Sequence, residues 1–377
     1  MSEIHKLTMP KWGLSMTEGK VEAWLVEEGG EIEPGMEVAD VDTDKISGSV
    51  EVPPGVTGHL RRQVARTGDV LPVGALLAVV AEAAVPDEEI EALIAEFQST
   101  FVPEAAAEEG PVGQDVEVGG VRLRYVAVGE GERRVVLLHG FGGNKDNWLF
   151  NLEPLAEGRT VYALDFPGHG ESDKRVADGS VAGLAATVAG FLDALGIDVA
   201  DLVAHSMGAA VAMAVAVAAP ERVRSLALLA PAGLGQEINT GYLRGFVGAQ
   251  SRRELKPHVE KLFADPALVT RDMLEDLLKF KRLDGAQAAL TTVLDGFIAG
   301  EGQASVLAEP VGGLGIPILV VSGSEDQVIP AGHSAALGGK AEVQVLEGRG
   351  HMVHMEAAGE VNRLLADHLR RASGGAA

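Results

Sequence analysis

The sequence of 377 residues contains no cysteine. This absence excludes disulfide bonds, thiolate metal ligands and a cysteine nucleophile, so any thiol chemistry must come from a cofactor. We expect no metal site. Long apolar runs are also absent, because the most apolar stretch, residues 202–219, is interrupted by His205, Ser206 and Gly208 and is followed by Pro220. We therefore predict a buried strand, turn and helix there, and no membrane-spanning segment.

Basic residues are scarce, with 31 Lys and Arg against 55 Asp and Glu, for a net charge of −24. Residues 1–113 hold 22 acidic and 7 basic residues, a net charge of −15, which leaves −9 for the rest. Such a chain repels nucleic acid and anionic membranes, so we expect neither as a partner. The acidic front half suits a basic docking surface on another protein, although solubility explains it equally well. The first residues lack the pattern of a secretory signal, and we expect a cytoplasmic protein.

The chain divides into three parts by composition. Residues 1–80 contain short strand-like segments between glycine-rich turns, which predicts a small all-β barrel or sandwich. These strand-like segments are residues 20–26, 37–41, 48–52 and 76–80. Residues 81–113 are rich in Ala, Glu and Pro, and we interpret them as an acidic linker with one short helix from Pro86 to about Gln98.

Residues 114–377 alternate between strand-like and helical segments, which is typical of a largely parallel sheet. The predicted strands are residues 135–138, 160–164, 202–204, 225–229, 318–322 and 343–346. Between about 235 and 302 the strands stop. That stretch predicts a purely helical cap over the sheet, with helices at residues 253–263, 271–280 and 286–298.

Lys45 stands in the tetrapeptide Asp42-Thr43-Asp44-Lys45, between two predicted strands. A lysine at a hairpin tip is open to a modifying enzyme, although a single surface lysine needs no function. Residues 1–80 resemble the lipoyl domains of 2-oxo acid dehydrogenase complexes. The matching features are Met9-Pro10, Met16-Thr17-Glu18-Gly19, the tetrapeptide at Lys45, and the turns at Gly58 and Gly68. The resemblance implies a lipoyl group on Lys45; the methionines that flank the lysine of biotinyl domains are missing.

Ser206 lies in Ala204-His205-Ser206-Met207-Gly208, between an apolar strand and an apolar helix. This context is typical of a nucleophile elbow, a tight turn that needs small residues two positions before and after the serine. Alanine replaces the usual first glycine. A serine hydroxyl needs a base to remove its proton, so the sequence must also supply a histidine and an acid.

In folds that carry a nucleophile elbow, the serine comes first along the chain, followed by the acid and then by the histidine. Asp326 follows the predicted strand at 318–322, and His351 follows the strand at 343–346. We predict that Asp326 and His351 are the acid and the base. Glu325 and His354 remain alternatives, and we interpret His205 as structural.

An oxyanion needs two backbone N–H donors. Met207 supplies one from the elbow itself. The loop after residues 135–138 begins His139-Gly140-Phe141, and its glycine allows a close approach, so we predict Phe141 N–H as the second donor.

Residues 114–377 resemble the α/β-hydrolase superfamily on these motifs. A lipoyl domain joined to such a domain resembles the dihydrolipoyllysine-residue acetyltransferase components of bacterial acetoin dehydrogenase complexes. This resemblance implies acetyl transfer from the lipoyl arm on Lys45, through Ser206, to coenzyme A. It also implies three partners: a thiamine-diphosphate acetoin dehydrogenase, a dihydrolipoamide dehydrogenase and a lipoylating enzyme.

Two other functions fit the same residues. Water could replace coenzyme A as the acceptor, which would make the chain a thioesterase or esterase. Alternatively, the hydrolase-like domain could serve as a scaffold for a lipoyl carrier. A triad indicates acyl transfer but does not identify the acceptor.

Overall fold

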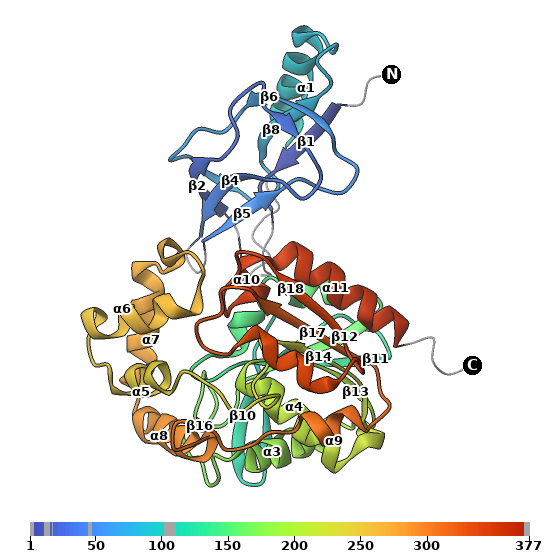
Figure 1. Ribbon diagram of the computed structural model, residues 1–377. Helices are drawn as coiled ribbons and strands as arrows, with labels where there is room; N and C mark the ends of the chain where they lie inside the picture. The colour runs from blue at the N-terminus through green and yellow to red at the C-terminus, as the bar shows by residue number, and fades with distance from the viewer. Residues whose placement is uncertain (1–3, 11–15, 17, 44–46, 102–110, 373–377) are drawn as a thin grey trace. The chain divides into compact units, whose positions relative to one another are not determined.

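The computed structural model describes residues 4–10, 16, 18–43, 47–101 and 111–372. The chain forms two compact units, Met1–Pro111 and Val112–Ala377. Figure 1 shows the strands of the first unit and the mixed strands and helices of the second. No described helix has the length and the apolar composition needed to cross a bilayer.

The N-terminal unit contains two four-stranded sheets, with strand orders β1-β8-β6-β3 and β5-β4-β2-β7. Their strands are β1 (Ile4–Thr8), β2 (Glu18–Trp24), β3 (Glu31–Ile32), β4 (Glu37–Asp42), β5 (Ser47–Glu51), β6 (Gly58–Gln63), β7 (Val70–Pro72) and β8 (Leu76–Ala81). A common core fills the unit, with Val21, Val41 and Leu60 fully buried. The predicted all-β architecture is confirmed, but four of these strands were not predicted. In β6, for example, Leu60 is the only apolar side chain, so no hydrophobic run marks the strand.

Helix α1 (Asp87–Thr100) begins directly after Pro86. Its buried residues, Ile90 and Ile94, pack against β8. Two ion pairs of 2.7 Å, from Arg61 to Asp87 and from Arg62 to Glu91, join the helix to β6. Both pairs are partly exposed and contribute little. The apolar contacts therefore hold α1 on the N-terminal unit.

We expect Ile90→Ala to lower the free energy of unfolding of the N-terminal unit by about 2–5 kcal/mol, because it leaves a cavity under a fully buried side chain. Amide hydrogen exchange in β8 measures this loss. Gln98→Ala, on the exposed face of the same helix, should change it by less than about 0.5 kcal/mol. Unchanged exchange in the Ile90 variant would mean that the unit is stable without α1.

The C-terminal unit is built on an eight-stranded sheet of order β18-β17-β14-β13-β11-β12-β10-β9. Its strands are β9 (Gln114–Val118), β10 (Val121–Val128), β11 (Arg133–Leu138), β12 (Arg159–Leu164), β13 (Ala200–His205), β14 (Val223–Leu229), β17 (Ile318–Gly323) and β18 (Glu342–Leu346). The six strands from β18 to β12 in this order pair in parallel. At the other edge β10 pairs antiparallel with both β12 and β9. The parallel sheet is confirmed; the two edge strands were not predicted, because charged residues alternate along them.

Helices cover both faces of the sheet. Alternate residues of β11 enter two separate cores, with Val136 and Leu138 on one face and Val135 and Leu137 on the other. The helices are α2 (Leu152–Leu155), α3 (Val181–Ala194), α4 (Met207–Ala218), α9 (Ala308–Gly312), α10 (Val353–Glu356) and α11 (Ala358–Arg371). Short 3-10 segments are Lys145–Trp148, Pro220–Arg222, Glu260–Leu262, Pro266–Leu268 and Ala331–Leu337.

The cap lies between β14 and β17 in the sequence. It contains α5 (Thr240–Gly248), α6 (Arg252–Val259), α7 (Arg271–Lys281) and α8 (Ala286–Phe297), of which α5 was not predicted. The prediction of a purely helical insertion is wrong at its end. There β15 (Ile298–Ala299) and β16 (Gly302–Gln303) form a small antiparallel ribbon, which is too short for a sequence pattern to mark. Figure 1 shows the cap helices grouped at one side of this unit.

Candidate active site

Ser206 occupies the turn between β13 and α4 with φ 53° and ψ −119°. Among the described residues other than glycine, only Ser206 and Ala230 have a positive φ. Such a conformation costs about 1–3 kcal/mol and persists only where the surroundings impose it. Here the Ser206 N–H donates to the Leu229 carbonyl oxygen at 3.0 Å, and the Ala232 N–H donates to the Ser206 carbonyl oxygen at 3.1 Å. The end of β14 and the loop that follows it therefore hold the turn on both sides.

The small residues around the serine are needed for packing. A Cβ added to Gly208 would lie 2.4 Å from the Leu138 carbonyl oxygen, so no side chain fits there. A Cβ on Gly140 would lie 3.0 Å from the Ser206 Cβ. Ala204, two positions before the serine, is fully buried, and its methyl group is accommodated in the core.

His351 stands between Ser206 and Asp326. Its Nε2 lies 2.9 Å from the Ser206 Oγ, and its Nδ1 lies 2.7 Å from the Asp326 Oδ2. The side chains of His351 and Asp326 are 2% and 1% exposed, so this chain of hydrogen bonds is shielded from water. The three residues follow the ends of three strands of the same sheet, β13, β17 and β18. The arrangement can pass a proton from the hydroxyl to the imidazole while the carboxylate fixes the ring.

Asp326 is oriented by its own loop. Its Oδ1 accepts hydrogen bonds from the N–H groups of Val328 and Ile329, at 2.7 and 2.9 Å. The other oxygen therefore faces His351. Glu325, the alternative acid, is exposed to solvent. The geometry thus favours Asp326 over Glu325.

The alternative base, His354, is fully buried and packs against the rings of Trp148 and His205, at centroid distances of 4.7 and 4.6 Å. Neither of its ring nitrogens has a hydrogen-bond partner in the described part of the chain. His205 lies between His351 and His354, and its Nε2 is 3.0 Å from the His351 carbonyl oxygen. Burial lowers the pKa of His205 well below its usual value. A neutral His205 thus supports the backbone of His351.

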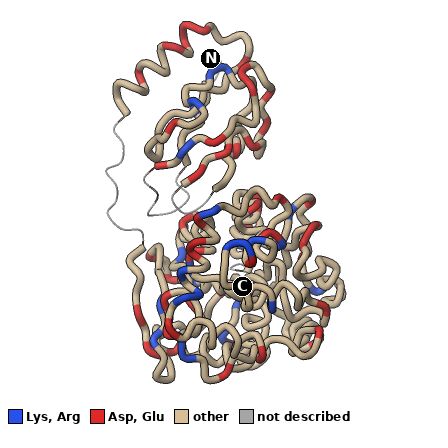
Figure 2. The backbone as a smooth tube through the Cα atoms, turned by 90° about the vertical axis from the view of Figure 1, so that its left-hand side faces the viewer, with Lys and Arg blue, Asp and Glu red and all other residues tan. Residues whose placement is uncertain are grey.

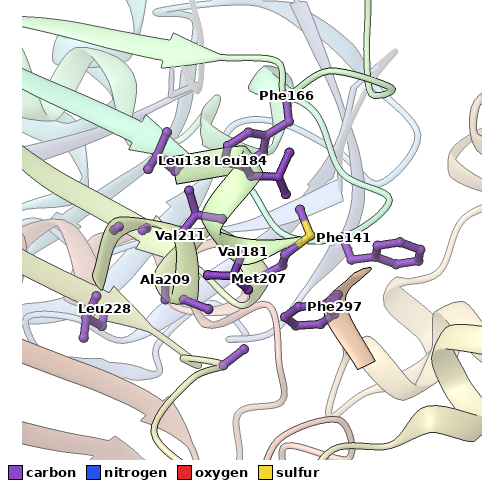
Figure 3. Packing of buried hydrophobic residues seen from close by; sticks show 14 of the residues in the cluster. Leu138, Phe141, Phe166, Val181, Leu184, Met207, Ala209, Val211, Leu228 and Phe297 are labelled. Atoms are coloured by element: carbon purple, nitrogen blue, oxygen red, sulfur yellow. The ribbon is translucent and has the colours of Figure 1, made fainter. Parts of the chain in front are cut away.

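The two predicted oxyanion donors come from different parts of the chain. Met207 is the first residue of α4, so its N–H has no acceptor within the helix. Phe141 follows Gly140 in the loop after β11, and it lines the same cavity as Ser206. Figure 3 shows the side chains of Met207 and Phe141 among the residues of the large buried cluster of this unit.

A cavity of about 720 Å³, including its solvent-open part, extends from Ser206 under the cap. Six residues of the cap form much of its wall: Tyr242, Leu243, Phe246, Phe263, Met273 and Leu277. Within the described part of the chain no charged Lys, Arg, Asp or Glu side chain lines it. A mostly apolar lining around a few polar groups is typical of a small-molecule site. Tyr242, Leu243 and Phe246 belong to α5; the only sequence signal for this helix was Asn239, whose side chain caps it.

Lys45 lies outside the described residues, so the structure gives no geometry for it. The strands before and after it, β4 and β5, pair antiparallel, and Asp42 is the partner of Ser47. The Ser47 hydroxyl also donates to Asp42 at 2.6 Å.

Comparison with known proteins identifies both units. Residues 5–80 match the family model of biotin-requiring enzymes, which covers biotinyl and lipoyl domains, and residues 133–358 match the α/β-hydrolase fold. The dihydrolipoyllysine-residue acetyltransferase component of the acetoin cleaving system of Pseudomonas putida is 54% identical, over 98% of this chain and all of the relative. The chain belongs to this family of acetyltransferase components. The component of the same name from Cupriavidus necator is 50% identical, over 97% of each chain.

Solved structures resemble the second unit of this acetyltransferase-family chain. A mutant of the meta-cleavage product hydrolase CumD of Pseudomonas fluorescens, complexed with acetates, aligns with a TM-score of 0.63 and 26% identity. The alignment covers 69% of this chain and 98% of the hydrolase. The predicted combination of a lipoyl-type domain with an α/β-hydrolase fold is thereby confirmed.

The buried histidines predict an acid-sensitive fold. Burial, and to a lesser degree His351, lowers the pKa of His354 to about 3. Below about pH 6.5 the unfolded chain takes up a proton that the folded His354 rejects, so stability is lost as the pH falls. We expect His354→Phe to reduce this loss by up to about 1.4 kcal/mol per pH unit.

Urea unfolding followed by circular dichroism at several values between about pH 7 and pH 5 measures the slope. Trp148→Phe, which changes the packing on the same ring, should lower stability equally at each pH. An unchanged slope in the His354 variant would show that this ring takes up its proton as readily in the folded protein as in the unfolded chain.

Proposed function

We propose that this chain is an acyltransferase that moves an acetyl group from a lipoyl arm on its own Lys45 to coenzyme A, through Ser206. The observation that carries the proposal is the 54% identity, over 98% of the chain, to a protein named as a dihydrolipoyllysine-residue acetyltransferase component. The hydrogen bonds that link Ser206, His351 and Asp326 support it.

A lipoyl group in amide linkage to Lys45 would carry the acyl group as a thioester. The cavity suits such an arm, because most of its wall is aliphatic and aromatic and the Ser206 hydroxyl lies in it. The same lining suits the slender pantetheine arm of coenzyme A. The described lining residues include no Lys or Arg for the phosphates, so the nucleotide end would remain outside the cavity.

In the first half-reaction His351 Nε2 takes the proton of Ser206 as the Oγ attacks the thioester carbonyl carbon. The N–H groups of Phe141 and Met207 would receive the oxyanion. When the C–S bond breaks, His351 returns the proton to the leaving sulfur, and acetyl-Ser206 remains. Asp326 stays ionised and stabilises the imidazolium.

In the second half-reaction His351 takes the proton of the coenzyme A thiol, and the sulfur attacks acetyl-Ser206. Collapse of the oxyanion breaks the C–Oγ bond, and the proton returns to Ser206. Acetyl-coenzyme A leaves, and the serine is regenerated. Water can follow the same path, and an apolar cap that keeps water from acetyl-Ser206 favours transfer over hydrolysis.

The relatives are named as components of a system, which implies other proteins in the same pathway. We propose a thiamine-diphosphate acetoin dehydrogenase that loads the arm, a dihydrolipoamide dehydrogenase that reoxidises it, and an enzyme that attaches the lipoyl group. Figure 2 shows that acidic residues far outnumber basic ones along the N-terminal unit, which suits basic docking surfaces on these partners. We further propose that residues 1–80 act as the carrier and residues 114–377 as the enzyme, in the cytoplasm. Of the predicted linker 81–113, α1 packs on the carrier unit, so we propose that only the stretch after this helix acts as the tether.

We expect Ser206→Ala to abolish acetyl-coenzyme A formation from acetyl-dihydrolipoamide, by about 10⁴-fold or more, because the nucleophile is lost. The assay measures acetyl-coenzyme A and free acetate together. Acetate as the main product of the unaltered protein would identify a hydrolase instead. Unchanged transfer by the variant would exclude the serine mechanism, and an unaltered protein that forms neither product would favour a carrier with a scaffold.

We expect intact-mass measurement to show one lipoyl adduct, which Lys45→Arg removes because arginine offers no amine for the amide bond. Lys20→Arg, in the same unit, is the matched control and should keep the adduct. An adduct that survives in the Lys45 variant would place the arm on another residue.

A further inference from the structure

Tyr242 places a hydroxyl group in the wall of the cavity that contains Ser206. The residue is 3% exposed, and its hydroxyl makes no hydrogen bond to any other residue in the described part of the chain. The protein does not enclose the oxygen completely, so it opens into the cavity. A buried phenol without a partner is costly unless a bound molecule supplies one.

The backbone of Tyr242 is fixed to the loop of Asp326. Tyr242 lies in the first turn of α5, and its N–H donates to the Asn239 Oδ1 at 2.8 Å. The backbone N–H of Asn239 donates to the Val328 carbonyl oxygen at 2.9 Å, and its Nδ2 donates to the Gln327 carbonyl oxygen at 2.9 Å. The phenol therefore has a defined position relative to the catalytic residues.

The phenol lies toward the catalytic end of the cavity. Its ring centroid is 6.2 Å from that of Phe246, which in turn is 6.1 Å from the ring of Phe141, the residue of the predicted oxyanion donor. Burial, together with the negative charge of Asp326, raises the pKa of Tyr242 to about 13. The phenol therefore keeps its proton and presents an O–H donor to a neutral acceptor.

Two other polar side chains of the lining, Asn144 and Asn147, are less suited to this task. Both are half-buried, so water can reach them. The oxygen of Asn144 accepts from the Asp146 N–H, and that of Asn147 accepts from the Asn144 N–H, each at 2.9 Å, which closes their own turn. A ligand in the buried part of the cavity therefore meets Tyr242 rather than these amides.

The chemistry of the two proposed arms indicates which acceptor the phenol meets. Each arm carries a sulfur and an amide, and the oxyanion donors receive the thioester oxygen. In coenzyme A the nearest amide follows the sulfur after a short ethylene spacer. In the lipoyl arm the amide stands at the far end of a long acyl chain. A donor close to the catalytic residues therefore suits the amide of coenzyme A.

We infer that Tyr242 is a specificity-determining residue for the acyl acceptor: its O–H donates to the carbonyl oxygen of the amide nearest to the coenzyme A sulfur. The inference rests on the proposed function, because coenzyme A enters the cavity only as the acceptor. This hydrogen bond places the thiol beside acetyl-Ser206, and water, which has no such arm, gains nothing from it.

Two small thiols test the inference. N-acetylcysteamine reproduces the reactive end of coenzyme A, and pentanethiol matches its chain without the amide. In a two-step reaction through acetyl-Ser206, kcat/KM for the acceptor reports the second half-reaction alone. We expect Tyr242→Phe to lower kcat/KM about tenfold for N-acetylcysteamine and coenzyme A, because their amide carbonyl loses its donor, and to leave the value for pentanethiol unchanged.

The variant keeps the ring and removes a hydroxyl without a partner in the described chain, so we expect it to fold. Tyr162→Phe, on β12 and outside the cavity lining, is the matched control and should affect neither thiol. The value of kcat/KM for the donor, acetyl-dihydrolipoamide, should also stay unchanged. Equal falls for the two thiols, no fall for either, or a fall for the donor in place of the acceptor overturns the inference.

A comparison on the unaltered protein needs no variant. Pentanethiol is the more apolar of the two thiols, so an apolar wall alone would favour it. We expect the unaltered protein nevertheless to prefer N-acetylcysteamine about tenfold in kcat/KM. Equal values, or a preference for pentanethiol, overturn the inference. If neither thiol nor coenzyme A is acetylated while acetate is released, it is the proposed function that fails.

Discussion

The backbone turn at Ser206 is the constraint on which the rest of the site depends. Its positive φ is unfavourable for a residue with a side chain, and hydrogen bonds to the end of β14 and to the loop after this strand hold it. The close approach of Gly208 to the end of β11 brings the start of α4 against the following loop. One strained residue therefore fixes three things together: the direction of the hydroxyl, the position of the Met207 N–H, and the distance to the loop that carries Phe141.

The histidine-rich surroundings keep that geometry without adding charge. Burial lowers the pKa values of His139, His205 and His354, so these rings act as neutral donors, acceptors and packing surfaces. His205 supports the His351 backbone, and His139 holds the carbonyl before Phe141. Additional positive charge beside His351 would oppose the imidazolium that forms during transfer. Neutral rings avoid this cost while they make the directed hydrogen bonds that aliphatic side chains cannot make.

Much of this architecture follows from local patterns in the sequence. Ser206, Asp326 and His351 each follow an apolar strand, and the ends of parallel strands meet at one edge of a sheet, so strand order alone brings them close. Strands β9, β10 and β6 show no continuous apolar run, because charged residues alternate with apolar ones or replace them. The residues that form the cavity wall could not be predicted from the sequence either. Nothing local distinguishes Phe246 from an ordinary core residue; its place depends on contact with Phe141, far away in the chain, at a ring distance of 6.1 Å.

Whether coenzyme A or water accepts the acetyl group depends on which of them can reach the serine. The catalytic groups treat a thiol and water alike, so selectivity must come from what reaches acetyl-Ser206. The described lining of the cavity is mostly apolar and uncharged, so it binds water poorly, whereas two long, mostly apolar arms can displace the water at little desolvation cost. A donor arm on the same chain would add to this bias, because tethering two groups raises their local concentration to roughly millimolar when the linker spans the sites. A fold that resembles hydrolases can therefore serve as a transferase without new catalytic residues, provided that its cap remains dry while the acyl group is on the serine.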